Sequence, residues 1–166
     1  MNERVWWEAM AAVASDLAAE SRGESWEVHQ AESARMTLAD RRGPALVRLR
    51  SGRVMEVEFV DAEDPVAGHI AVRQEGRHGL LRASAVVTAS GARRSLRAED
   101  ADAARPIASW LREASLADAA VHALDCTGNW VRGRLDIVAL DHVEIATGER
   151  TVCLTLEAAD LWWVVG

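Results

Sequence analysis

Residues 47–59 decide the fold of this chain, and they have the sequence VRLRSGRVMEVEF. Before the Ser-Gly-Arg segment at 51–53, apolar residues alternate with arginines; after it, apolar residues alternate with glutamates. Successive residues of a β-strand point to opposite faces. The stretch therefore predicts a β-hairpin with one apolar and one charged face.

The same pattern continues to residue 91 and then recurs between residues 119 and 166. Short strands are expected near 69–73, 80–81 and 86–88, and in the second half near 121–124, 131–137, 141–145, 152–156 and 161–166. Overlaying the halves pairs Gly52 with Gly128, Phe59 with Leu135, 69–72 with 142–145, 81–86 with 156–161, and Gly91 with Gly166. We predict an internal duplication of five strands.

Helical patterns precede both halves. In the first 43 residues, one helix is expected from Asn2 to Gly23 and another from Ser25 to about Asp40, ended by Gly43-Pro44. Pro106 and a short apolar stripe predict a further helix before the second half. The expected organisation is a helical segment at 1–43, strands at 44–91, a linker with a short helix at 92–118, and strands at 119–166.

Five short strands in fewer than 50 residues are too few for a large sandwich, but they can close into a small bent barrel without exposed edges. Gly133 lies inside an expected strand, where a side chain would crowd a bent backbone. The predicted fold class is α+β. N-terminal helices are followed by two five-stranded antiparallel β-barrels of the SH3-like or Sm-like kind, each preceded by a helix.

The second half resembles the two Sm motifs of LSm and bacterial Hfq proteins. The resemblance depends on Gly128, Gly133-Arg134-Leu135, Asp141-His142-Val143 and the closing residues 159–165. The whole chain is also similar to actinobacterial proteins labelled "Fis family transcriptional regulator". The resemblance implies an RNA-associated or gene-regulatory binding module. It transfers no RNA pocket to any residue, because neither half has the Sm asparagine of the strand-two to strand-three region or the Arg-Gly pair near the last turn.

Composition narrows the function classes. The chain has 166 residues and a net charge of −7, and all 19 basic residues are arginines, so Schiff-base and lysine-base chemistry is excluded. It contains no phosphate-loop, nucleophile-elbow or HExxH motif. We therefore expect no catalytic residues, cofactor or metal. The sequence shows no secretory signal or apolar run of membrane-spanning length, so we expect a cytoplasmic protein without membrane contact.

His69 and His142 occupy equivalent places in the duplication, and a shared structural role is preferred to a metal site because no second ligand has zinc-like spacing. We expect Asp141 and His142 to point to opposite faces of a strand and to form no hydrogen-bonded pair. Cys126 and Cys153 are interpreted as small apolar residues; a redox-sensitive link is the alternative.

Arginines and tryptophans supply the candidate binding residues. The nucleic-acid candidates cluster around the first hairpin and in the linker: Arg41, Arg42, Arg48, Arg50, Arg53, Arg93, Arg94 and Arg97. A solvated charged surface is the simpler interpretation, since residues 44–91 hold six acids and six arginines. The interface candidates are Trp6, Trp7, Trp162 and Trp163.

The sequence predicts a non-enzymatic binding module that forms homo-oligomers, with RNA or another protein as the further partner. The alternative is a protein–protein assembly module that does not bind nucleic acid. The two are distinguished by RNA binding at low salt and by the oligomeric state.

Overall fold

The computed structural model describes residues 37–94 and 104–165. Residues 38–94 and 104–165 belong to one compact unit. Most of the predicted N-terminal helical segment lies outside the described residues, as do Trp6, Trp7 and Arg97. The last part of its second helix is described and differs from the prediction. Leu38–Asp40 form a 3-10 turn, and the first strand already begins at Arg41 and runs through Gly43 and Pro44.

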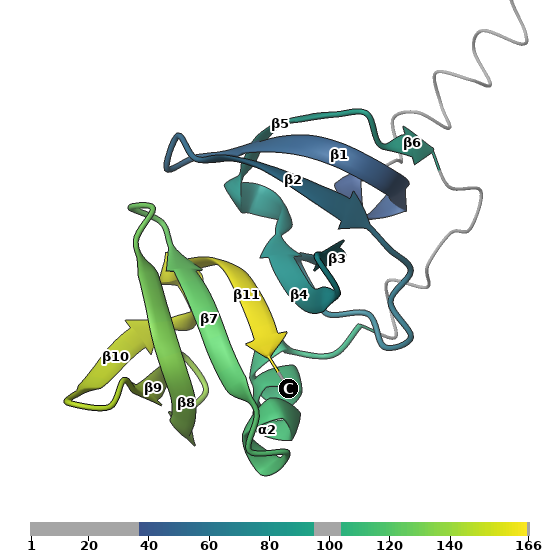
Figure 1. The fold of residues 1–166 in the computed structure, drawn as a ribbon. Helices are drawn as coiled ribbons and strands as arrows, with labels where there is room; N and C mark the ends of the chain where they lie inside the picture. Colours follow the sequence, from purple (N-terminus) through teal and green to yellow (C-terminus); the bar gives the residue numbers. More distant parts are fainter. Residues whose placement is uncertain (1–36, 95–103, 166) are drawn as a thin grey trace, which may run out of the picture. The chain divides into compact units, whose positions relative to one another are not determined.

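The described residues contain eleven β-strands and one α-helix (Figure 1). The strands are β1 (Arg41–Leu49), β2 (Val54–Phe59), β3 (His69–Gln74), β4 (Arg77–Arg82), β5 (Val86–Ser90), β6 (Arg93–Arg94), β7 (Ala120–Asp125), β8 (Trp130–Val138), β9 (His142–Ala146), β10 (Thr151–Thr155) and β11 (Ala159–Val165). The helix, α2, spans Ile107–Leu116. Short 3-10 turns at Ala83–Ala85 and Leu156–Ala158 precede β5 and β11.

The strands form one open antiparallel sheet in the order β10-β9-β8-β7-β11-β4-β3-β2-β1-β5, and β6 also pairs with β1. The prediction of two separate barrels is therefore wrong. Closing the second group of strands would need β10 to pair with β11. One edge of β11 is bonded to β7, and the other is occupied by β4. The sequence pattern located the hairpins but not this connection between them.

The two groups of five strands have matching registers, and we call them repeat 1 (β1–β5) and repeat 2 (β7–β11). Val47 pairs with Ala89 in repeat 1, and Ala123 pairs with Trp162 in repeat 2. In both repeats the register of the last strand shifts by one residue, at Val87 and at Asp160. Only the segment between the equivalent residues Phe59 and Leu135 and the next strand differs in length, with nine residues between Phe59 and His69 and six between Leu135 and His142, because β8 continues to Val138.

These registers correct the end of the sequence overlay. Because Ile70 pairs with Leu81 and Val143 with Leu154, the equivalent of Leu81 is Leu154 and not Leu156. The equivalent of Gly91 is likewise Val164 and not Gly166. The overlay was therefore two residues out from the fourth strand onward, where alternating apolar residues allow either alignment.

Each repeat has its own hydrophobic core, and the two cores lie on opposite faces of the continuous sheet. Trp162 packs into the core of repeat 2 with α2, whereas Trp163 packs into the core of repeat 1. Adjacent residues of a strand point to opposite faces. Strand β11 belongs to repeat 2 but pairs with β4 of repeat 1, so each of its faces is covered by one core. Both indoles are therefore buried, at 0% and 2% exposed.

Helix α2 covers the core of repeat 2. Pro106 lies at its N-cap, and the apolar stripe buries Ala108, Leu111 and Ala114. The short helix predicted after Pro106 is thus confirmed. The crowding expected at Gly133 is also confirmed, because a Cβ there would lie 2.1 Å from the carbonyl oxygen of Ala146.

Candidate functional site

The junction between the repeats is the β4–β11 ladder. Leu161, Trp162 and Trp163 pair there with Leu81, Leu80 and Gly79. A Cβ on Gly79 would lie 2.2 Å from the carbonyl oxygen of Trp162 and 2.5 Å from the indole of Trp163. Gly79 is therefore needed so that the backbone of β11 and the large side chain of Trp163 can approach β4.

Two arginines of repeat 1 hold the junction from one end. The Arg50 Nε donates to Asp160 Oδ1 at 2.8 Å, and its Nη2 donates to the carbonyl of Glu157 at 3.1 Å. The Arg82 guanidinium donates to the carbonyls of Ala159 and Leu156. The hydrogen bond to Asp160 raises the pKa of Arg50, and burial lowers the pKa of Arg82. The Asp160 carboxylate is fully buried and depends on Arg50 for its charge partner.

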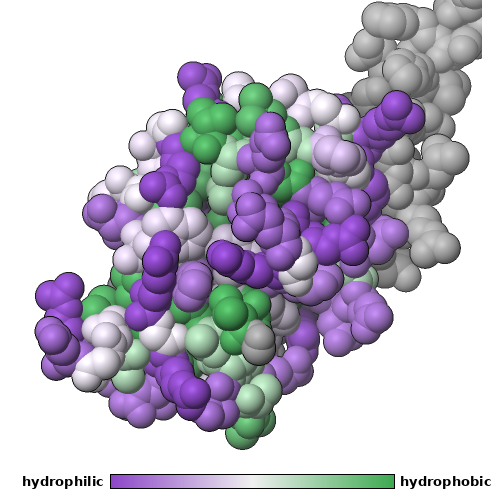
Figure 2. Space-filling view, viewed as in Figure 1, coloured by the Kyte–Doolittle hydropathy of each residue, from purple (hydrophilic) through white to green (hydrophobic). Residues whose placement is uncertain are grey.

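The two outer strands of the sheet, β5 and β10, each have one neighbour among the described residues. Their sequences are VVTAS and TVCLT, without a charge or proline. Proteins usually protect an exposed strand edge with such residues. Val87 is 55% exposed and Cys153 is exposed, while their equivalents Asp160 and Leu80 are buried in the junction. Hydrophobic side chains gather over the β1 and β5 end of the sheet (Figure 2).

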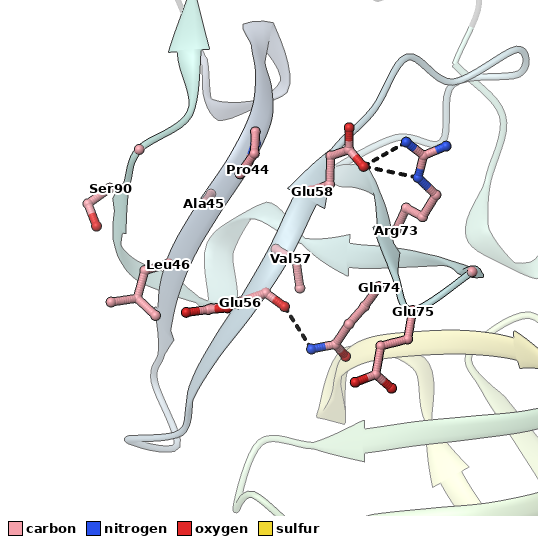
Figure 3. A pocket seen from close by; sticks show the side chains of 12 residues that line it. Pro44, Ala45, Leu46, Glu56, Val57, Glu58, Arg73, Gln74, Glu75 and Ser90 are labelled. Atoms are coloured by element: carbon pink, nitrogen blue, oxygen red, sulfur yellow. Dashed lines mark hydrogen bonds and ion pairs between the residues drawn. The ribbon is translucent and has the colours of Figure 1, made fainter.

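A groove of about 700 Å³ lies beside β5, where β2 separates from the β3–β4 turn (Figure 3). Val57 lines it, at the place that Gly133 occupies in repeat 2. The Gln74 side chain crosses the opening and donates to the backbone carbonyl of Glu56 at 2.7 Å. Arg73 donates to Glu58 through Nε and Nη2, at 3.0 and 2.7 Å. The groove therefore has an acidic rim, on which Arg73 neutralises one carboxylate.

Four of the arginine candidates form two backbone pairs where β6 joins the start of β1, with Arg41 opposite Arg94 and Arg42 opposite Arg93. Like charges in directly opposite positions destabilise a ladder. Arg42 is bonded to Asp61 at 2.6 Å, and Arg41 donates to the carbonyl of Ala92. We call these four residues the arginine ladder.

The other described arginine candidates lie elsewhere. Arg48 is exposed in the middle of β1, paired with Val54 and Thr88. Arg50 belongs to the junction. Arg53 lies over the Trp130 ring, 5.6 Å from its centroid. Trp130, which the sequence analysis did not select, packs against the core of repeat 1 from repeat 2.

The two described tryptophan candidates, Trp162 and Trp163, are interior residues that join the repeats. Neither is available at an outer surface of the described unit. The junction residues that the sequence analysis missed are Gly79, Arg82 and Asp160. Of these three, only Asp160 gave a signal in the sequence, as an isolated acid within the closing apolar strand.

His69 and His142 differ in their surroundings despite their equivalence. The His69 Nδ1 lies 2.8 Å from the carbonyl of Ala67, and its Nε2 is buried without a hydrogen-bond partner. Burial lowers the pKa of His69. His142 is bonded through Nδ1 to Asp141 Oδ1 at 2.7 Å, so the expectation that these two residues form no pair is wrong. Asp141 precedes β9, and strand alternation does not govern its direction. The His142 hydrogen bond lowers the pKa of Asp141.

The described residues contain no cluster of three His, Cys, Asp or Glu side chains arranged to hold a metal ion. Cys126 and Cys153 are both free. None of the helices in the described part of the chain has the length and apolar character needed to cross a membrane. Comparison with protein-family models, curated proteins and solved structures finds no match for the chain. The Sm resemblance therefore stays a prediction.

Proposed function

We propose that this protein is a non-enzymatic assembly module whose copies join edge to edge, β5 of one copy pairing with β10 of the next. One observation carries the proposal. Strands β4 and β11 already join the repeats within the chain, and β10 and β5 are their equivalents without a partner in the described sheet. Unprotected edge groups are templates for further strand pairing. Such a contact is head-to-tail, and repeats of it give rings or filaments.

The internal register predicts the contact between copies. Thr88, Ala89 and Ser90 would lie opposite Leu154, Cys153 and Val152, as Leu161, Trp162 and Trp163 lie opposite Leu81, Leu80 and Gly79. The side-chain sizes fit this register. The internal pair combines the large Trp163 with a glycine, and the equivalent pair combines the small Ser90 with a valine.

A single new cysteine tests the register. In a Cys126→Ser background, Ala89→Cys should form a disulfide under mild oxidation with the native Cys153 of another copy, since paired strand positions allow disulfide geometry. We expect a ladder of covalent multimers on non-reducing gels. The matched control is Leu116→Cys, at an 88% exposed helix position away from both edges. Equal cross-linking by both variants would contradict the register.

The oligomeric state of the full chain tests the function itself. Light scattering should show a mass above that of one 18.1 kDa chain, increasing with concentration. Cys153→Lys should reduce the mass without unfolding the chain, because a charge on an edge strand opposes pairing and this side chain is exposed. A wild-type protein that stays monomeric at all concentrations would overturn the proposal.

A second candidate function, binding of single-stranded RNA, is favoured by the arginine ladder. Guanidinium groups suit phosphate binding, and Arg42 and Arg93 occupy directly opposite strand positions. Affinity for a short RNA should fall with salt by about 0.7 log units per log unit for each phosphate contact. Arg41→Ala with Arg93→Ala should weaken binding, while Arg112→Ala on α2 should not. Absence of binding at low salt would exclude this function.

A further inference from the structure

We infer that the groove beside β5 receives Arg150 from the next copy, attracted by Glu56 and Glu58. The inference rests on the proposed assembly and names the residues that give the contact its specificity. It depends on a comparison of charges between the internal junction and the equivalent contact between copies.

At the internal junction the equivalent residues are all cationic or neutral. Arg77, at the start of β4, is the equivalent of Arg150. It lies close enough to His122 to lower the pKa of that residue, after the larger effects of desolvation and of Arg132. The registers make His122 the equivalent of Leu46, and Arg132 the equivalent of Glu56. The internal junction therefore has no carboxylate at the places of Glu56 and Glu58, which Arg132 and Arg134 occupy.

Between copies the same places carry opposite charges. The proposed register puts Val152 beside Ser90, whose row continues across the sheet through Leu46 to Glu56. Arg150 directly precedes β10 and takes the place of Arg77 at the start of β4, so the proposed register puts it beyond Val152, at the Ser90 end of the contact. Ser90 lines the groove, and the carboxylates of the groove include the exposed Glu56 and the partly exposed Glu58.

The Glu56 and Arg150 side chains are available for the contact. No ion pair engages the Glu56 or Arg150 side chain within residues 37–94 and 104–165, whereas Glu58 already bonds to Arg73. Glu75 adds a further carboxylate to the groove. On the other copy, Glu149 occupies the place of Gly76, which leaves Arg150 as the cation of that turn. The groove and the turn are complementary in charge, which favours encounter in this register.

Charge exchange tests the inference with two single variants. Arg150→Glu and Glu56→Arg should each weaken self-association about tenfold, because an attraction of surface charges becomes a repulsion. Mixing the two variants should restore assembly, since every contact in an alternating arrangement then has one arginine and one glutamate. Arg112→Glu is the control for a change in net charge alone. Association is measured by sedimentation at low ionic strength, and circular dichroism verifies that each variant is folded.

The outcomes separate this inference from the assembly proposal. Loss of association in each single variant and recovery in the mixture would support the groove contact. Association of both variants at wild-type strength, or no recovery on mixing, would overturn it while leaving edge-to-edge assembly in place. A monomeric wild-type chain would overturn both.

Discussion

Removing Arg50 should destabilise the protein far more than neutralising its partner Asp160. The Asp160 side chain is 0% exposed, and the Arg50 side chain is 39% exposed. Arg50→Ala leaves a buried carboxylate without the guanidinium that bonds to it, which costs about 3–5 kcal/mol of unfolding free energy. Asp160→Asn leaves a guanidinium that can reach water and still bond to the amide oxygen. The loss there is about 1–2 kcal/mol.

The equivalent positions in the two repeats suggest a compensating double variant. The residues at the positions equivalent to Arg50 and Asp160 in the other repeat are the uncharged Cys126 and Val87. Arg50→Met with Asp160→Val should therefore be within about 1 kcal/mol of the wild type, because an apolar pair can replace a buried ion pair. The two single changes would then be strongly non-additive.

Urea unfolding followed by tryptophan fluorescence measures these differences, since Trp162 and Trp163 adjoin Asp160. With a slope of about 1.5 kcal/mol per molar urea, Arg50→Ala should lower the midpoint by about 2–3 M. Protein concentration must be the same in every experiment because the chain is expected to associate. If Arg50→Ala cost no more than Asp160→Asn, or if the single effects were additive, the reasoning about the buried carboxylate would be refuted.

Further predictions concern the glycine of the junction and acid stability. Gly79→Ala should destabilise the unit by about 1–3 kcal/mol in urea unfolding, because its Cβ overlaps β11; a wild-type midpoint would show that the junction can relax. The lowered pKa of His69 means that the folded state takes up fewer protons than the unfolded state below about pH 6.5, so stability should decrease as the pH falls. His69→Gln should reduce this loss, and parallel stability curves for the two proteins would count against it.

Local elements could be predicted from the sequence because their signals are local. Alternation around Val57 and the turn at Gly52 predicted the first hairpin, and the stripe after Pro106 predicted α2. The equivalence of the two halves could be recognised from the sequence as far as His142. Up to that residue, the turn residues and the alternation of apolar residues support the same alignment. Each of these signals depends on neighbours within one strand, turn or helix.

The junction could not be predicted, because alternation does not specify which strand lies beside another. The pair Trp162 and Trp163 suggested one buried and one outward indole, and only the β4–β11 pairing explains why both are buried. Gly79 looks like an ordinary turn glycine next to Gly76. Its actual role becomes visible only when the backbone of β11 is placed beside it. The arginine ladder likewise depends on β6 returning to β1.

The position of β11 also determines how the unit can come apart. Trp163 completes the core of repeat 1, although it belongs to the last strand of repeat 2. Separating the repeats would expose this indole and leave a hole in the core of repeat 1. Unfolding of one repeat must therefore weaken the other, and the described unit should melt in a single cooperative transition. The chain contains a duplicated pattern, but thermodynamically the two repeats are inseparable.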